Sequence, residues 1–186
     1  MNPIFFSVPM LIATAIAAHL TPALAAPGHT YEFGAPGKAA SATRTIEVNL
    51  ADNYYEPDAI SVKQGETVRF VLKNSGELLH EFSIDTLAAH TAHRKEMAEM
   101  MEMGMITPTG VEPNKMNMDH SKMKMGDASE TTRKPMAHDD PNNVMLAPGE
   151  SKELVWKFTK AMEIEFACNM PGHYESGMMG RVDFSK

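Results

Sequence analysis

Residues 166–180 read Phe-Ala-Cys-Asn-Met-Pro-Gly-His-Tyr-Glu-Ser-Gly-Met-Met-Gly and contain a thiol, an imidazole and a thioether, in Cys168, His173 and Met178. The Pro-Gly pair between the first two of these groups predicts a turn. We place Cys168 at the end of one strand, His173 on the loop and Met178 at the start of the next strand. This arrangement lets the three side chains converge on one point.

The three groups together indicate a metal site. A Cys thiolate, two imidazoles and a weak axial Met form the trigonal copper site that is used for electron transfer. The second imidazole must come from elsewhere, and His80, at the start of a predicted strand after the Asn-Ser-Gly turn of residues 74–76, is the candidate. The sequence thus predicts one type 1 copper ion bound by His80, Cys168, His173 and Met178. Zinc is the alternative ion, although structural zinc sites rarely use a thioether.

The remainder of the chain contains short runs in which apolar and polar residues alternate, as is typical of half-buried strands. We predict strands over 45–50, 58–62, 67–72, 78–84, 150–158 and 181–184, with a further alternating run over 162–166. Seven short strands without a strong helix among them predict an all-β fold, a β-sandwich. Because aromatic residues make up only 7% of the chain, we expect the core to be aliphatic.

The composition and the motifs exclude several classes of protein. The net charge of −7 argues against a nucleic-acid-binding protein. A single Cys excludes a disulfide framework and any Cys-rich zinc or iron–sulfur site. The sequence contains no Gly-rich phosphate loop, no Ser–His–Asp spacing and no His-x-His pair of the multicopper oxidases. We therefore expect a protein that is not an enzyme.

The N-terminal residues 1–25 contain no Asp, Glu, Lys or Arg and are mainly apolar. Ala23-Leu24-Ala25 has the small-x-small pattern of a signal-peptide cleavage site. We predict a signal peptide that is cleaved after Ala25 or Ala26, export to the periplasm and no membrane anchoring after cleavage. The alternative is an uncleaved anchor or a buried helix.

The predicted mature chain has three parts. Residues 26–44 are rich in Gly, Ala, Pro, Ser and Thr and are expected to form a flexible N-terminal segment. The predicted domain covers 45–186 and is interrupted by an insertion at 88–143, which holds ten of the 17 Met and four of the eight His residues. Residues 88–103 have the composition of a helix. The rest of the insertion contains several Pro and Gly residues and is expected to be mobile.

The insertion offers soft ligands for additional copper, as Cu(I) or Cu(II). The candidates are His90, His93, Met97, Met116, Met118, His120, Met123 and Met125. His90, His93 and Met97 recur at helical spacing, so the alternative for them is an apolar helix face that packs on the sandwich. The remaining Met residues stand among polar residues, where no such face exists. For these the alternatives are oxidant-scavenging Met or neutral filler.

The complete pattern resembles the cupredoxins, the family of plastocyanin and azurin with blue or green type 1 copper. The resemblance covers residues 45–186 without the insertion. It is carried by Pro57-x-x-Ile60-x-Val62-x-x-Gly65-x-Thr67-Val68-x-Phe70, by the Cys-x4-His-x4-Met spacing and by Gly177-Met178-Met179-Gly180. It implies a Greek-key β-sandwich, copper binding through Nδ1 of His80 and His173, a Cys168 thiolate and a weak axial Met178.

Two residues directly beside predicted ligands, Met179 and Glu81, could also affect the site. Met179 neighbours the predicted axial ligand, and in an extended segment it should point to the opposite face from Met178. Many cupredoxins have Asn directly after the first His ligand, where it ties the two ligand loops together by hydrogen bonds. This chain has Glu81 there. Since contacts around the ligands tune a metal site, this departure leaves the colour and the reduction potential open.

The Met/His-rich insertion makes the chain similar to the periplasmic cupredoxins linked to bacterial copper tolerance. That similarity implies a monomer that binds or buffers copper and exchanges electrons or copper with a partner, such as a c-type cytochrome, a copper oxidase or a copper transporter. One alternative is an electron-transfer carrier whose insertion serves only as a docking surface. Further alternatives are an oxidase of Cu(I) or superoxide, and a structural interaction domain.

Overall fold

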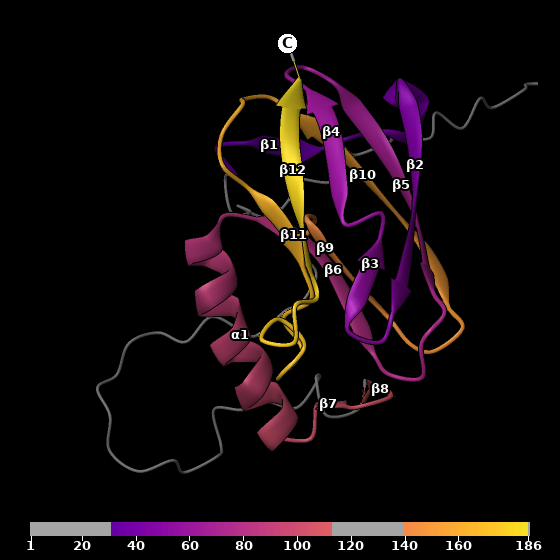
Figure 1. The fold of residues 1–186 in the computed structure, drawn as a ribbon, viewed down its shortest axis with the longest axis vertical. Coiled ribbons are helices and arrows are strands. Elements are labelled where there is room, and N and C mark those ends of the chain that lie inside the picture. The colour runs from indigo at the N-terminus through magenta and orange to yellow at the C-terminus, as the bar shows by residue number, and fades with distance from the viewer. Residues whose placement is uncertain (1–30, 113–139, 186) are drawn as a thin grey trace, which may run out of the picture.

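The structure, a computed structural model, describes residues 31–112 and 140–185. In this part of the chain two five-stranded sheets face each other, and the helix α1 (Leu87–Glu102) lies alongside them (Figure 1). No helix among these residues has the length and apolar character to span a membrane. The predicted signal peptide over 1–25 lies outside the described residues.

The two sheets have the strand orders β1-β10-β5-β2-β3 and β4-β12-β11-β6-β9. The first consists of β1 (Gly34–Pro36), β10 (Ser151–Phe158), β5 (Thr67–Asn74), β2 (Arg44–Ala51) and β3 (Tyr54–Glu56). The second consists of β4 (Ala59–Lys63), β12 (Met179–Ser185), β11 (Glu165–Ala167), β6 (His80–Asp85) and β9 (Asn143–Leu146). Each sheet has one parallel pair, β2 with β5 and β4 with β12, and its other pairs are antiparallel. The predicted β-sandwich is confirmed.

Aromatic rings fill the space between the sheets. Phe70 of β5 lies 5.3 Å from Phe82 of β6, centroid to centroid, and Phe82 lies 5.3 Å from Phe166 of β11. Trp156 and Phe158 of β10 are fully buried in the same core. Aliphatic side chains such as Leu50, Val62 and Ile84 are fully buried in the same core, and the rings are packed among them. The expectation of an aliphatic core is therefore right for most core residues and omits the aromatic ones. A few rings contribute strongly to the core, because each aromatic side chain buries a large apolar area.

Residues 31–44, which the sequence suggested to be part of a flexible segment, are ordered against the sandwich. Gly34–Pro36 form β1, which pairs with β10, and a short 3-10 helix follows at Ala39–Ser41. The ring of Phe33 lies 5.5 Å from that of Trp156. A Cβ atom on Gly34 would overlap Trp156, so glycine allows this close approach. The aromatic contact supplies the apolar burial that the composition of the segment conceals.

The described part of the insertion differs in part from the expectation. Helix α1 confirms the predicted helix, and the Thr86 hydroxyl at its start accepts a hydrogen bond from the backbone N–H of Ala89 at 3.3 Å. The next residues were expected to be mobile but form a hairpin of β7 (Ile106–Thr107) and β8 (Gly110–Val111), with Ile106 buried. Asn143, the predicted last residue of the insertion, already belongs to β9.

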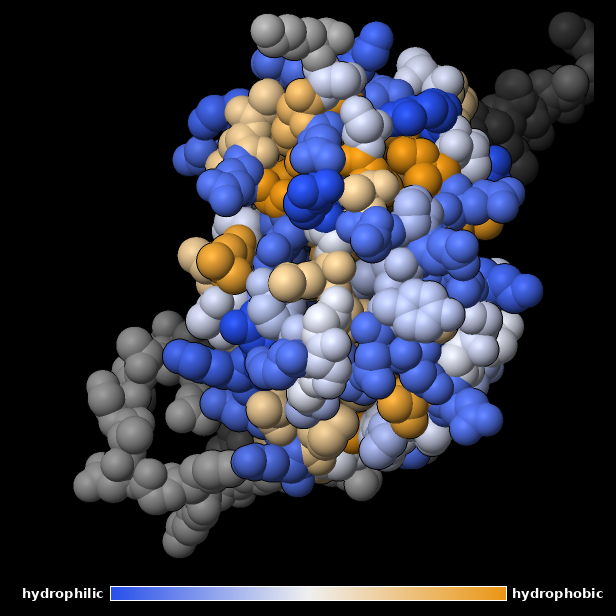
Figure 2. All heavy atoms as spheres, in the orientation of Figure 1, coloured by the Kyte–Doolittle hydropathy of each residue, from blue (hydrophilic) through white to orange (hydrophobic). Residues whose placement is uncertain are grey.

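The surface in Figure 2 is mostly hydrophilic, and the apolar side chains on this face are interspersed with polar ones. Among the described residues the large apolar side chains that are clearly exposed are Tyr54, Leu87 and Met179. They come from three different segments of the chain, and single exposed apolar residues of this kind are normal on a protein surface.

Gly180 provides a test of how tightly the sheets are packed. It lies opposite Phe166 in the pairing of β12 with β11, and a Cβ atom there would overlap the Phe166 ring and come within 2.6 Å of the carbonyl oxygen of Asp58. We expect Gly180→Ala to lower the free energy of unfolding in urea by about 1–3 kcal/mol. Gly110→Ala is the control, because its Cβ would meet only the Thr107 hydroxyl, at 4.0 Å. An equal loss of stability in both variants would show that the close approach of Gly180 to Phe166 and Asp58 does not limit the size of this residue.

Candidate metal centre

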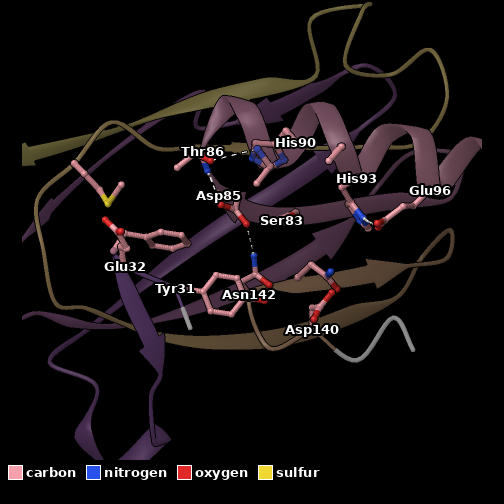
Figure 3. Close-up of a pocket in the computed structure, with 15 residues that line it drawn as sticks. Tyr31, Glu32, Ser83, Asp85, Thr86, His90, His93, Glu96, Asp140 and Asn142 are labelled. Atoms are coloured by element: carbon pink, nitrogen blue, oxygen red, sulfur yellow. Dashed lines mark hydrogen bonds and ion pairs between the residues drawn. The ribbon is translucent and has the colours of Figure 1, made fainter. Parts of the chain in front are cut away.

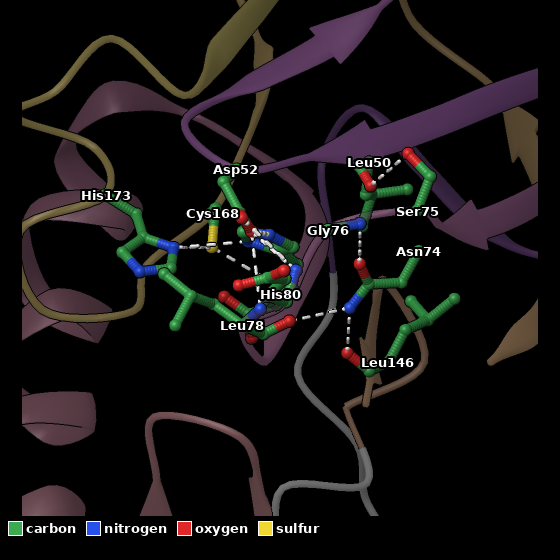
Figure 4. A network of polar contacts seen from close by, with 12 residues as sticks. Leu50, Asp52, Asn74, Ser75, Gly76, Leu78, His80, Leu146, Cys168 and His173 are labelled. Atoms are coloured by element: carbon green, nitrogen blue, oxygen red, sulfur yellow. Dashed lines mark hydrogen bonds and ion pairs between the residues drawn. The ribbon is translucent and has the colours of Figure 1, made fainter. Parts of the chain in front are cut away.

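His80, the first residue of β6, is fully buried and follows a turn that Asn74 holds in place. The Asn74 amide donates hydrogen bonds to the carbonyl oxygens of Leu78 and Leu146, both at 2.8 Å. Its side-chain oxygen accepts a bond from the N–H of Gly76 at 2.9 Å (Figure 4). The buried amide thus fixes the backbone that leads into His80.

Asp52 orients the His80 ring through its Nε2 atom. Its carboxylate lies 2.9 Å from Nε2 of His80 and also accepts the backbone N–H of Glu77 at 3.1 Å (Figure 4). Because a carboxylate accepts, Nε2 carries the proton and Nδ1 keeps a free lone pair. Burial lowers the pKa of His80 more than Asp52 raises it, so the ring is neutral. A neutral imidazole in this orientation can bind a metal ion through Nδ1.

The loop after β11 brings the other candidate ligands together through its own backbone. The N–H of Cys168 donates to the carbonyl oxygen of Met178 at 3.1 Å, and the N–H of Met178 donates to the carbonyl oxygen of His173 at 3.0 Å. Gly172 and Gly177 have φ values of 85° and 96°, which side chains rarely adopt. The turn predicted between Cys168 and His173 is therefore present.

Three donor atoms converge at the end of β6 and β11. The Nδ1 atoms of His80 and His173 lie 3.2 Å apart, and Sγ of Cys168 lies 3.4 Å from Nδ1 of His173. Two nitrogens that each bind one ion at about 2 Å can lie at most about 4 Å apart, so this spacing fits a shared ion. One thiolate and two imidazoles are the donor set of a type 1 copper site. Within 31–112 and 140–185, no other cluster of three or more His, Cys, Asp and Glu side chains has the spacing of a metal site.

Met178, the predicted fourth ligand, is held in the same loop as Cys168 and His173. Its side chain is fully buried, and its backbone is bonded to both Cys168 and His173. Met179 is 44% exposed, so the two neighbouring thioethers point to opposite faces, as expected. The role of Met178 as axial ligand stays a prediction.

Cys168 is a buried thiol until an ion binds. Burial raises its pKa to about 12, the charge of Glu81 acts in the same direction, and the N–H groups of Glu81 and Met170 act against it. The Glu81 N–H donates to Sγ at 3.3 Å. The pKa of His173 is lowered, first by burial and then by the repulsion that a protonated His80 would exert. Ion binding at this site therefore releases one thiol proton and none from the imidazoles.

Glu81 joins the two ligand segments. It is buried, and one carboxylate oxygen accepts the backbone N–H of Asn169 at 3.2 Å and the side-chain amide of Asn169 at 2.7 Å. The other oxygen lies 2.9 Å from Nε2 of His93. A glutamate thus ties the loops together at the position where many cupredoxins use asparagine.

The described candidates for additional copper have other contacts. Nδ1 of His90 lies 3.2 Å from the side-chain oxygen of Asn169, and His93 lies between Glu81 and Glu96. Met97 is fully buried in the hydrophobic core, which favours the alternative of a packed helix face. Figure 3 places His90 and His93 on the side of α1 that borders a cavity of about 360 Å³. The remaining candidates, Met116, Met118, His120, Met123 and Met125, lie outside the described residues.

Sequence reasoning missed Asp52, Asn169 and the role of Glu81. Asp52 is 28 residues from His80, and Asn169 is 88 residues from Glu81, so no local spacing relates them. The available signal was chemical: a carboxylate directly after a ligand, in a strand that is otherwise buried, requires a partner.

Comparison with known proteins identifies the family of the chain and several relatives. The sequence profile of the cupredoxin-like domain matches residues 11–108. Over 160 residues (86% of each chain) the sequence is 55% identical to a Pseudomonas aeruginosa protein named copper-resistant cuproprotein CopI. A Rubrivivax gelatinosus protein of the same name is 39% identical over 151 residues, 81% of this chain and 72% of that protein. Reduced auracyanin from Roseiflexus castenholzii superposes with a TM-score of 0.51 at 20% identity, covering 78% of this chain and 99% of auracyanin, which supports the fold alone.

Asn74 can be tested as the support of the turn before His80. Asn74→Ala leaves the carbonyl oxygens of Leu78 and Leu146 without this donor, and we expect the free energy of unfolding to fall by about 2–4 kcal/mol in a urea titration. Asn49→Ala is the control, because the described residues provide no hydrogen bond to its half-buried side chain. A change in Asn74→Ala as small as that in the control would show that the turn does not depend on this amide.

Proposed function

The chain belongs to the cupredoxin-like family, and on this premise we propose that it binds one copper ion through His80, Cys168 and His173, with Met178 as axial ligand. One observation carries the proposal: Sγ of Cys168 and a ring nitrogen of each histidine lie within 4.8 Å of one another in the protein interior. No hard oxygen ligand is part of this cluster, and soft sulfur with imidazole favours copper.

We further propose that the copper serves copper tolerance in the periplasm. The support is the name of the relatives in Pseudomonas aeruginosa and Rubrivivax gelatinosus, copper-resistant cuproprotein. Export follows from the apolar N-terminal segment with its cleavage motif. We propose a monomer that exchanges electrons or copper with a protein partner, of which a c-type cytochrome, a copper oxidase and a copper transporter are the candidates.

The residues around the site suit binding and exchange better than catalysis. Copper, when bound, supplies one-electron transfer. Asp52 holds the His80 ring with Nδ1 facing the cluster, and burial keeps Cys168 and Met178 away from water. His173 is half-buried, so it is the ligand that a partner protein can approach most closely. With four side chains directed to one ion, no position is left for a substrate, and we propose that the protein is not an enzyme.

A second candidate function is electron transfer with the insertion as a docking surface. Arg94 of α1 stacks over the Tyr174 ring at 4.0 Å and lies 3.4 Å from Glu175, both of which follow His173 directly. The helix is therefore part of the surface around the half-buried ligand. Rapid reduction by a c-type cytochrome, without copper sensitivity on deletion of the gene, would favour this function.

The copper site is tested by the visible spectrum of the purified protein after addition of Cu(II). We expect an intense sulfur-to-copper charge-transfer band that is lost in Cys168→Ala, because the band requires the thiolate. Met178→Leu should change the balance of blue and green absorption, and Met179→Leu should leave it unchanged, since Met179 points away from the site. A colourless wild-type protein would contradict the proposed site.

Additional copper in the insertion is tested by counting bound ions. We expect the full chain to bind more than one equivalent of Cu(I), because thioethers are soft ligands. Replacing Met116, Met118, Met123 and Met125 by Leu keeps similar volumes and removes the sulfur. The variant should lose the excess copper and retain the charge-transfer band with Cu(II). A stoichiometry of one in both proteins would remove the proposed role of these residues.

A further inference from the structure

Helix α1 contacts the ligand segments at three neighbouring points. His90 reaches Asn169, the residue after Cys168, and Arg94 lies over Tyr174, the residue after His173. Between them, His93 reaches Glu81, the residue after His80. The helix therefore touches the chain neighbour of each of the three clustered ligands, although it belongs to the inserted segment.

The contact between His93 and Glu81 is a pair of opposite charges in the interior. Glu81 is 1% exposed and the His93 side chain 14% exposed. Burial works against the charge of His93, but Glu81 and Glu96 outweigh it and raise the pKa of His93 to about 9. Both carboxylate oxygens of Glu81 have partners, Asn169 at one oxygen and Nε2 of His93 at the other, 2.9 Å away. This is the geometry of a buried carboxylate paired with an imidazolium.

Glu81 links His93 to the Cys168 sulfur, because it contacts both. Its backbone N–H donates to Sγ of Cys168 at 3.3 Å. Its carboxylate uses one oxygen for His93 and the other for both N–H donors of Asn169. The remaining polar atom of the Asn169 side chain faces His90. These four residues form a continuous chain of hydrogen bonds from α1 to both ligand segments.

We propose that His93 is a positioning residue of the metal centre: by neutralising and holding Glu81, it sets the hydrogen bonding and the charge beside the Cys168 sulfur, and so the reduction potential of the copper. This inference rests on the proposed copper site. It assigns the helical part of the insertion a role in tuning the copper, in addition to any ion that the rest of the insertion binds.

The proposal predicts the sign of two opposite changes. Without the positive charge of His93, the negative charge of Glu81 is uncompensated beside the copper and stabilises Cu(II) over Cu(I). His93→Gln keeps a hydrogen-bond donor and should lower the reduction potential. Glu81→Gln removes the negative charge, which is nearer to the sulfur than His93 is, and should raise the potential. If the helix only supported the fold, the two substitutions would not shift the reduction potential in opposite directions, because a loss of packing does not depend on the sign of the charge that is removed.

The experiment measures the reduction potential and the charge-transfer spectrum of the copper-loaded full chain. We expect His93→Gln and Glu81→Gln to shift the ratio of Cu(II) to Cu(I) at a fixed applied potential by about tenfold or more, in opposite directions. For a one-electron couple, a tenfold change corresponds to a shift of about 59 mV in the reduction potential. His93→Lys keeps a positive donor and should recover most of the wild-type potential. Lys95→Gln removes the same charge from an exposed position on the same helix and should change the potential less than twofold, since solvent and salt screen that charge.

The outcomes separate this inference from the proposed function. A wild-type protein that binds no copper with a charge-transfer band overturns the copper site and the inference with it. A normal band in the wild type, with a potential that His93→Gln leaves unchanged or shifts no more than Lys95→Gln, overturns the inference alone. If His93→Gln does not fold, Glu81→Gln and His93→Lys carry the test. A potential unmoved by Glu81→Gln then overturns the inference, and a raised one, with His93→Lys near wild type, supports it.

Discussion

Ala167 lies opposite Ser83 in the antiparallel pairing of β11 with β6, and every feature of the metal centre depends on this register. The pairing places Cys168, just past the end of β11, beside the start of β6, where His80 and Glu81 lie. Because successive side chains of a strand point to opposite faces, a shift by one residue would turn the ligand segment of the shifted strand away from that of the other strand. The aromatic core holds the register, since Phe82 and Phe166, one on each strand, are packed against each other.

The polar groups in and around a buried cluster of ligands need hydrogen-bond partners. An imidazole, a carboxylate and an amide in the interior each cost free energy unless they are bonded, and breaking a buried ion pair costs several kcal/mol. Asp52 is the partner of His80, and Asn169 and His93 are the partners of Glu81. The metal centre is accordingly a network drawn from four segments of the chain. A substitution in any of them is expected to alter the geometry of the ligands.

The parts of this arrangement that the sequence predicts are those with short-range causes. The Cys-x4-His-x4-Met spacing, the positive φ at Gly172 and the alternating strands all lie within a few neighbouring residues. The segments at 31–44 and 104–112 were misjudged because each is anchored by only a few apolar residues, Phe33 in the first and Met105 and Ile106 in the second, and the Trp156 partner of Phe33 is distant in the sequence. Asp52 and Glu81 were not assigned for the same reason: their partners are set by strand register and helix placement, which composition does not encode.

The place of the insertion explains why its helix contacts the ligands. It follows β6, whose first residue is His80, so α1 begins at the end of that strand remote from the site. A helix that then returns along the strand rises about 1.5 Å per residue, so its first two turns carry it about 11 Å back toward the ligand end. His90 and His93 lie in those turns, and they meet Asn169 and Glu81 there. The helix therefore reaches the surroundings of the metal because it runs back along β6, and not because it begins near the ligands.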